Sequence, residues 1–259
     1  YLLMESVYGD RTRTGDEDHM LQLKATIEDI AVRGGTLLIP AFSTERTQDI
    51  IFEIRQLMQK QQVPSMPVYI DSPLAQKITT AFLEYPQYFS EAIQERVKGG
   101  EHIFAFSELH FIEGSDASRA ISSPRGPKII IAGSGMSNGG RVHGHEKNIL
   151  PDKNSTLLIV GYQAAGSLGR RLLEGEKNVI IQGERIKVAA KVEVIYGYSA
   201  HMDSAQLLEF ASDVADSVKQ IFVVMGEPSA SSFLVQRIRD YVGVKAIAPT
   251  ARDTAVIEL

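Results

Sequence analysis

One stretch of the sequence, Gly197-Tyr198-Ser199-Ala200-His201-Met202-Asp203-Ser204, joins a predicted strand to a predicted helix. The preceding residues, 192 to 196, are mostly β-branched or aromatic and favour a strand. Residues 203 to 218 carry apolar side chains at helical spacing, with Asp203 or Ser204 suited to the N-cap. Ligands bind at such strand-to-helix turns because loop amides and helix N-termini point there. His201 is therefore a candidate site residue, although a histidine that only caps the helix or satisfies a core hydrogen bond fits the same pattern.

The composition is that of a soluble globular protein. With 44% hydrophobic residues, the 259-residue chain can bury one large core or two modest ones, and no apolar run reaches the roughly 20 residues of a membrane span. Cysteine is absent, so a metal would need His, Asp or Glu ligands, and a cytoplasmic location is expected. The net charge of -5 argues against a non-specific nucleic-acid binder, but it permits a local basic groove.

The first residues, Tyr1-Leu2-Leu3-Met4-Glu5-Ser6, have the pattern of a buried strand already under way. They lack an initiator methionine and a polar lead-in. We therefore expect the sequence to be the later portion of a longer polypeptide, or a processed chain.

Strands and helices alternate along most of the chain. A helix is expected over residues 19 to 32, a strand over 36 to 42 followed by a second helix, and a strand over 66 to 70 followed by a helix with Pro73 in its first turn. Residues 86 to 127 show little periodicity and are expected to be peripheral. A hairpin is expected between residues 179 to 182 and 187 to 196, and further strands over 220 to 225, 244 to 248 and 255 to 259. This alternation predicts an α/β fold with a largely parallel sheet.

Two glycine-bearing turns follow predicted strands. Gly133-Ser134-Gly135-Met136-Ser137-Asn138-Gly139-Gly140-Arg141 follows the strand over 128 to 132, and residues 161 to 171, which include Arg170 and Arg171, follow the strand over 156 to 160. Glycine lets the backbone approach an anion, and the N-terminus of the following helix favours its charge. Glycines at such turns often serve tight packing alone, but two turns after neighbouring strands favour one phosphate site.

Six ordered motifs resemble those of the β-CASP branch of the metallo-β-lactamase superfamily. They are Met4-Glu5-Ser6-Val7-Tyr8-Gly9-Asp10-Arg11, Ile39-Pro40-Ala41-Phe42, Asp71-Ser72-Pro73-Leu74-Ala75, Gly133-Ser134-Gly135-Met136, Gly161-Tyr162-Gln163 with Gly166-Ser167-Leu168-Gly169-Arg170-Arg171, and Ser199-Ala200-His201. The family includes the nuclease of eukaryotic pre-messenger-RNA 3′-end cleavage, its archaeal relatives and bacterial exonucleases. This chain looks most like the bacterial and archaeal type.

The resemblance implies an RNA-processing or RNA-degrading nuclease in which a β-CASP domain is inserted into a metallo-β-lactamase domain, with single-stranded RNA running between the domains to two zinc ions. The segments it implies are a metallo-β-lactamase-type segment over residues 1 to 15, the parallel-sheet β-CASP domain over 16 to 190, and the C-terminal part of a metallo-β-lactamase αββα domain over 191 to 259. The expected partners are single-stranded RNA and the missing N-terminal half of the metallo-β-lactamase domain, with a homo-oligomer left open and no membrane.

The resemblance also assigns residues. Glu5 falls on the family's first acidic motif and His201 on the histidine that this residue is thought to orient, so both are predicted to be catalytic. A carboxylate beside an imidazole fixes its tautomer and favours its protonated form, which suits the ring to protonate the leaving oxygen of a phosphodiester. The predicted RNA-binding residues are Ser134, Gly135, Met136, Arg170, Arg171 and Ser199.

Two departures from the family pattern concern the metal. The family's third motif has a metal-ligating histidine where this chain has Met225, and a thioether is a poor zinc ligand. The His-X-His-X-Asp-His motif that begins such enzymes does not occur in this sequence. His143 and His145 form a pair, but two residues apart on a helix they do not share a face. No metal ligand is therefore predicted in this chain, and zinc is expected only for the intact family enzyme; the other histidines, His19, His102 and His110, are expected at surface or core positions.

Three functions fit the sequence. The first is a nuclease whose zinc ligands lie on residues outside this sequence, so that the chain alone would be inactive. The second is a catalytically inactive relative that serves as an RNA-binding or scaffold subunit, which Met225 supports. The third, a doubly wound binder of small phosphates or nucleotides, explains the glycine turns but not Glu5 with His201.

Three geometric expectations accompany these assignments. Glu5 and His201 should lie within hydrogen-bond reach, about 2.6 to 3.2 Å apart. Residues near one edge of the β-CASP sheet should include Gly34, Pro40, Asp71, Ser134 and Gly161. Arg141, Arg170 and Arg171 should face a phosphate groove, unless Arg170 or Arg171 folds back onto Glu174 or Glu176 as a surface ion pair.

Overall fold

The computed structural model describes residues 1 to 12, 19 to 122 and 126 to 257. The chain divides into two compact units, one made of Tyr1–Asp16 with Ser199–Leu259 and the other of Glu17–Tyr198. The sequence placed a segment boundary at residue 190, whereas residues 191 to 198 belong to the larger unit. Of the strand expected at the C-terminus, residues 255 to 257 form no strand, and residues 258 and 259 lie outside the described residues.

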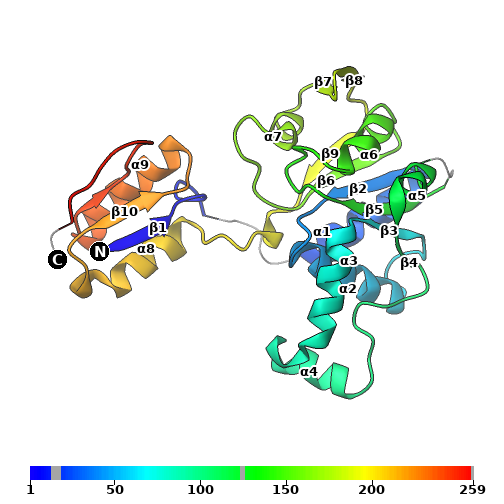
Figure 1. Cartoon of the computed structure of the whole chain (residues 1–259), viewed down its shortest axis with the longest axis horizontal. Helices are drawn as coiled ribbons and strands as arrows, with labels where there is room; N and C mark the ends of the chain where they lie inside the picture. Colours follow the sequence, from blue (N-terminus) through cyan, green and yellow to red (C-terminus); the bar gives the residue numbers. More distant parts are fainter. Residues whose placement is uncertain (13–18, 123–125, 258–259) are drawn as a thin grey trace. The chain divides into compact units, whose positions relative to one another are not determined.

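The larger unit is built on a six-stranded parallel sheet with the order β4-β3-β5-β2-β6-β9 (Figure 1). Its strands are β2 (Thr36–Pro40), β3 (Val68–Asp71), β4 (Leu109–Phe111), β5 (Lys128–Ala132), β6 (Thr156–Ile159) and β9 (Lys191–Val194). The strands β2, β5 and β6 are buried at every residue. Such continuous burial is what near-continuous apolar runs predict for a parallel sheet covered on both faces.

Helices cover both faces of this sheet, as Figure 1 shows. One hydrophobic core packs α1 (His19–Arg33), α2 (Arg46–Gln59) and α3 (Pro73–Glu84) on one face, and a second core packs α6 (Val142–Ile149) and α7 (Leu168–Leu173) on the other. The residues of β5 alternate between the two cores, because successive side chains of a strand point to opposite faces. The predicted α/β fold with a parallel sheet is confirmed.

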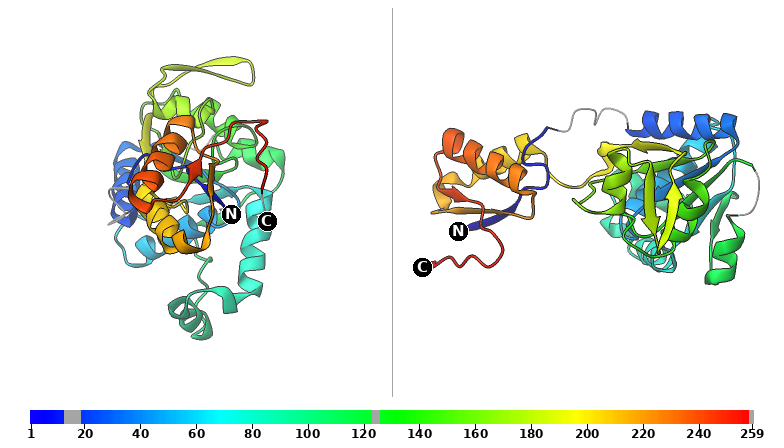
Figure 2. Two further views of the ribbon diagram at one scale, coloured as in Figure 1. Left: turned by 90° about the vertical axis from the view of Figure 1, so that its left-hand side faces the viewer. Right: turned by 90° about the horizontal axis from the view of Figure 1, so that it is seen from above.

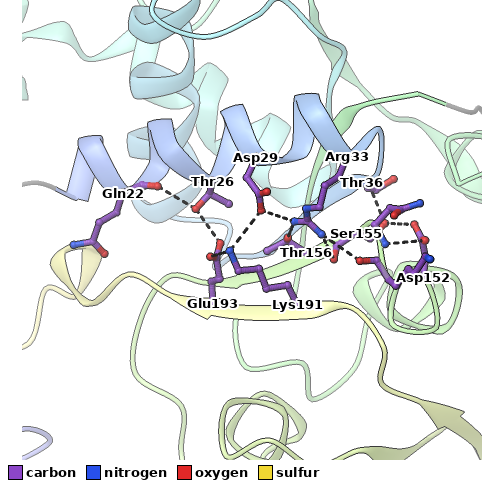
Figure 3. A network of polar contacts seen from close by, with 12 residues as sticks. Gln22, Thr26, Asp29, Arg33, Thr36, Asp152, Ser155, Thr156, Lys191 and Glu193 are labelled. Atoms are coloured by element: carbon purple, nitrogen blue, oxygen red, sulfur yellow. Dashed lines mark hydrogen bonds and ion pairs between the residues drawn. The ribbon is translucent and has the colours of Figure 1, made fainter.

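A polar network fastens α1 to β6 and β9 (Figure 3). Thr26 Oγ1 donates to Glu193 Oε2 at 3.0 Å, and Arg33 Nη2 donates to Thr156 Oγ1 at 2.5 Å. Lys191 Nζ lies 2.6 Å from a Glu193 oxygen. The polar side chains of β9 thus find partners on α1 and on β9 itself, which explains why this strand belongs to the larger unit.

Two segments project from the larger unit (Figure 2, left). One contains the 3₁₀ turn Pro86–Tyr88 and α4 (Glu91–Lys98), and the other is the hairpin of β7 (Asn178–Ile181) and β8 (Glu184–Lys187). The expected hairpin is present, but its second strand was wrongly placed over residues 187 to 196: β7 pairs with β8, which ends at Lys187, and β9 pairs with β6. Residues 86 to 127 are only partly peripheral, since β4 forms the edge of the sheet and is followed by α5 (Gly114–Ala120).

The carboxyl ends of the sheet strands carry most of the residues expected at one edge. Pro40 ends β2, Asp71 ends β3, and Ser134 and Gly161 follow β5 and β6 within two residues. Gly34 precedes β2 and belongs to the opposite edge, so that part of the expectation was wrong. The strands β5 and β6 are also not neighbours, because β2 lies between them.

The smaller unit holds a three-stranded parallel sheet of β1 (Leu2–Glu5), β10 (Ile221–Val224) and β11 (Ala246–Ile247), in the order β1-β10-β11. Its core packs the sheet against α8 (Ser204–Asp213) and α9 (Pro228–Arg237), and α9 continues into a π-helical turn over Ile238–Val242. After α8 ends, a 3₁₀ turn over Ala215–Ser217 follows, so the helix stops short of residue 218. None of the helices in the described part of the chain combines the length and apolar character needed to cross a membrane.

Candidate functional site

Glu5 and His201 meet in the smaller unit. Glu5 ends β1, and its Oε2 lies 2.9 Å from His201 Nδ1, which confirms the predicted proximity. The backbone N–H groups of Val7 and Met202 also donate to the Glu5 carboxylate, each at 3.3 Å. Glu5 therefore fixes the orientation of the His201 ring through Nδ1, and Nε2 is the ring nitrogen left to contact a substrate. The His201 side chain is 40% exposed, so a substrate can reach it.

The turn that carries His201 is held by the start of α8. Asp203 Oδ1 accepts hydrogen bonds from the N–H groups of Ala205 and Gln206, while Gln206 Oε1 accepts from the Asp203 N–H at 3.0 Å. This reciprocal capping box selects Asp203 from the two N-cap candidates of the sequence. Ser199 Oγ accepts from the His201 N–H at 3.4 Å, so the predicted phosphate-contacting serine lies within the same turn.

Met225 directly follows the residue that pairs with Glu5. Val224 is the partner of Glu5 in the register of β1 and β10, and Met225 is 76% exposed.

Within the ranges described, no group of three His, Cys, Asp or Glu side chains could hold a metal ion. A carboxylate already bound to an imidazole, beside a thioether, does not make the four-ligand site that zinc requires. The described residues of this chain therefore do not fit a zinc site on their own.

The turn after β5 is closed by its own hydrogen bonds. The Ser134 N–H donates to the Gly139 carbonyl at 3.3 Å, and Ser134 Oγ accepts from the Asn138 N–H at 3.0 Å. Gly140 has a φ of 82°, and a Cβ there would lie 2.8 Å from the Gly133 carbonyl oxygen, so glycine is required. Among the residues that the structure describes, no hydrogen bond engages the N–H groups of Gly135 and Met136, which are the donors of this turn that an anion could take.

The second glycine-bearing turn packs against the first. Gln163 Nε2 donates to the Gly135 carbonyl at 3.0 Å, and the Gly169 N–H donates to the Met136 carbonyl at 3.2 Å. A Cβ at Gly169 would lie 1.8 Å from Gln163 Oε1, so only glycine permits this approach. The two turns meet as predicted, although their strands are not neighbours.

Arg170 and Arg171 are both paired with carboxylates. Arg170 Nε lies 2.6 Å from a Glu174 oxygen, and Arg171 Nε lies 3.4 Å from a Glu176 oxygen. The structure thus contains the surface ion pairs that the sequence left open as the alternative to phosphate contacts. Both pairs are partly exposed to solvent, so their stabilising contribution is small.

Arg141 differs from its expected place in a phosphate groove. Its Nη1 donates to Asp71 Oδ1 at 2.5 Å, and Asp71 Oδ2 lies 2.7 Å from His145 Nε2 and accepts a further hydrogen bond from Ser118. Burial works to raise the pKa of Asp71, but the hydrogen bonds from His145, Ser118 and Arg141 outweigh it and hold the pKa below its usual value. The positive charge of Arg141 is therefore matched by a fully buried carboxylate at the end of β3.

Two further acidic groups were not identified from the sequence. Glu146 is fully buried on α6, and within the described part of the chain neither of its carboxylate oxygens has a partner at good hydrogen-bond geometry. Burial raises the pKa of Glu146 to about 7, and the nearby Ser137 hydroxyl opposes this only in part. Glu53 on α2 accepts a hydrogen bond from the Tyr198 hydroxyl, and its other oxygen lies 2.8 Å from His19 Nε2. Burial, followed by the charge of Glu53, raises the pKa of Tyr198. Glu53 therefore joins His19, the first residue of α1, to Tyr198 within the larger unit.

These clusters join residues that are distant in the sequence. Asp71 and His145 are 74 positions apart, and Glu53 and Tyr198 are 145 apart. No local spacing marks such pairs. The available signals concerned Asp71 alone, which directly follows a predicted buried strand and begins one of the six motifs.

Two family models match the chain. The Beta-Casp domain matches residues 47–172, and a domain described as a Zn-dependent metallo-hydrolase RNA specificity domain matches residues 185–249. Together with the parallel three-layer unit, these matches place the chain in the class of proteins that combine a Beta-Casp domain with a Zn-dependent metallo-hydrolase RNA specificity domain. The chain belongs to the β-CASP family of the metallo-β-lactamase superfamily.

Several named proteins are similar to this chain. Ribonuclease TTHA0252 of Thermus thermophilus is 33% identical over 209 residues, which are 81% of this chain and 48% of that protein. Transcription termination factor FttA of Pyrococcus horikoshii is 31% identical over 261 residues, or 98% of this chain and 40% of that protein. The FttA of Methanosarcina mazei is 27% identical, with 98% of this chain and 41% of that protein covered. The chain spans less than half the length of these curated relatives.

Proposed function

We propose that this chain is the β-CASP domain and C-terminal portion of a zinc-dependent hydrolase that cleaves single-stranded RNA once the N-terminal metallo-β-lactamase half is present. Membership of the family and the similarity to a ribonuclease support RNA as the substrate. The observation that carries the proposal is the 2.9 Å contact between Glu5 Oε2 and His201 Nδ1. The zinc ions would be held by residues outside this sequence.

In this proposal His201 is the general acid. Water supplies the oxygen that attacks phosphorus and gives up a proton to solvent. The P–O bond to the leaving nucleoside breaks, and His201 Nε2–H donates its proton to the oxygen of the leaving nucleoside. Because Nδ1–H is already bound to Glu5, a second proton on Nε2 makes the ring cationic, and the carboxylate stabilises that charge until the proton leaves. The pair thus has the geometry of a carboxylate-oriented acid.

The RNA phosphates are proposed to contact Gly135 and Met136 through their backbone N–H groups, Ser134 through its hydroxyl group, and Ser199 near the catalytic pair. Arg170 and Arg171 are proposed to exchange Glu174 and Glu176 for phosphate when RNA binds. Guanidinium groups bind phosphate through two parallel hydrogen bonds, which an exposed ion pair does not prevent.

The test uses the full-length protein and a labelled single-stranded RNA. We expect His201→Gln to lower kcat by about 10²- to 10⁴-fold with a smaller change in KM, because a general acid acts in the transition state. His110→Gln, which changes an exposed histidine on β4, is the matched control and should leave kcat unchanged. Equal rates for wild type and His201→Gln would refute the assigned role.

A second candidate function is a catalytically inactive β-CASP homologue that binds RNA as a scaffold subunit. The exposed Met225 at a position where the family has a histidine favours it. Zinc content and RNA cleavage of the full-length protein, with and without Met225→His, separate the two functions. A wild-type protein that binds RNA but neither holds zinc nor cleaves, and that Met225→His does not rescue, would be the scaffold.

A further inference from the structure

An open pocket of about 750 Å³ lies at the carboxyl ends of β2 and β5, beside the first glycine-bearing turn. Its wall includes Phe42, Ser43, Leu74, Ser134 and Asn138. The pocket therefore adjoins the amides that are proposed to bind RNA phosphates, but the side chains of its wall have a different chemical character.

Phe42 presents an aromatic ring to this pocket from a fixed backbone. The side chain is 52% exposed, although it lies only two residues after a fully buried strand. Its carbonyl accepts a hydrogen bond from Thr47 Oγ1 at 2.8 Å, at the start of α2. Against one part of the ring lies Gly135, where a Cβ would come within 2.9 Å of Phe42 Cδ2. The absence of a side chain at Gly135 thus lets the turn support the ring directly.

The chemical character of the pocket lining suits a nucleic-acid base better than a phosphate. None of the described residues that line it has a charged side chain, and Leu74, which is 58% exposed, adds a second apolar surface. The hydroxyl groups of Ser43 and Ser134 and the amide of Asn138 supply neutral donors and acceptors. A nucleic-acid base, which is a flat uncharged ring with polar edges, suits these side chains better than an anionic phosphate does.

We propose that Phe42 is a stacking platform for one base of the bound RNA, with the adjoining phosphate on the amides of Gly135 and Met136. This inference rests on the proposed function, because it assigns a subsite to the same RNA. Single-stranded nucleic acids are commonly held by aromatic rings on which bases stack, and each stacked base contributes about 1 to 3 kcal/mol. Removing the ring should therefore weaken RNA binding by about 5- to 150-fold.

The experiment measures binding of the full-length protein to two single-stranded RNAs of equal length, one intact and one abasic at a single position scanned along the strand. We expect Phe42→Leu to weaken binding of the intact RNA by at least about fivefold, and Phe42→Tyr to retain it because the ring is kept. The salt dependence of binding should stay unchanged, since no phosphate contact is lost. At one position, removing the base should weaken binding by the wild type to the level at which Phe42→Leu binds the intact RNA. With that abasic RNA, Phe42→Leu should bind as the wild type does.

Tyr88→Leu is the matched control, because Tyr88 is an 84% exposed aromatic residue of the same unit outside the pocket. It should leave binding unchanged. If wild type binds intact RNA while Phe42→Leu binds equally well and no abasic position matters, the base subsite is refuted and the proposed function stands. If wild type fails to bind RNA at all, the proposed function fails and the subsite fails with it.

Discussion

Glu5 Oε2 and His201 Nδ1 lie 2.9 Å apart although the two residues are 196 positions apart in the chain. Glu5→Gln keeps the shape of the side chain and removes its charge, so the protonated imidazole loses its stabilising partner. We expect kcat for RNA cleavage by the full-length protein to fall by about a hundredfold with a smaller change in KM. Glu28→Gln, which changes an exposed residue on α1, should leave kcat unchanged. A kcat of Glu5→Gln that matches wild type would remove Glu5 from the mechanism.

Glu146 should make the larger unit less stable as the pH rises. Its carboxyl has a pKa of about 7 in the folded chain against a usual value of 4.5, so the folded state holds the proton more tightly than the unfolded state. The stabilising effect of that proton is complete below about pH 4.5 and is lost as the pH rises through about 7. Glu146→Gln should therefore raise the free energy of unfolding by on the order of 3 kcal/mol at about pH 8 and change it little at about pH 4.

Urea unfolding at both pH values checks this expectation. Glu174→Gln is the control, because that carboxylate is 60% exposed and its ion pair with Arg170 should contribute less than about 1 kcal/mol at either pH. A Glu146→Gln variant that is equally stabilised, or equally destabilised, at both pH values would show that the proton on Glu146 does not control stability.

Glu45 adopts a backbone conformation that favours glycine. Its φ is 62° and its ψ is -65°, and the Arg46 N–H donates to the Thr44 carbonyl at 2.7 Å, which closes a strained γ-turn just before α2. Glu45 makes no side-chain capping hydrogen bond. Glu45→Gly should therefore raise the thermal midpoint, with a gain of about 1 kcal/mol. Thr44→Gly, at the exposed neighbouring residue, should lower it; a loss of stability in Glu45→Gly would show that the turn is not strained.

Sequence reasoning was most successful where a structure depends on adjacent residues. The strand β5 has the predicted bounds of residues 128 to 132, and Pro73 and Asp203 occupy the first turn and the N-cap that their chemistry predicts. Glu5 and His201 were found through motifs of the family, since no local spacing relates them. The fold class followed from the alternation of strands and helices, which is a property of the whole chain.

The errors concern pairing between distant segments. The residues of β9 were assigned to the second strand of a hairpin, but the partner of β9 is β6, and Glu193 on β9 accepts a hydrogen bond from Thr26 on α1. Arg141 was placed in a groove because it follows glycines, but its partner is Asp71, 70 positions away. The sequence shows which residues can form such contacts. Which of them pair depends on the order of the strands in the sheet, which brings distant segments together.

The ion pairs of Arg170 and Arg171 provide the last prediction. If both arginines exchange carboxylate for phosphate, replacing them by Ala should weaken binding of single-stranded RNA and make its salt dependence shallower by about one unit for each arginine. Replacing Glu174 and Glu176 by Gln should have the opposite effect on affinity, because the guanidinium groups are then released without being removed. Binding across a salt series measures both variants of the full-length protein. If neither pair of substitutions changes the affinity or the slope, the arginines only stabilise α7 and the phosphates are bound elsewhere.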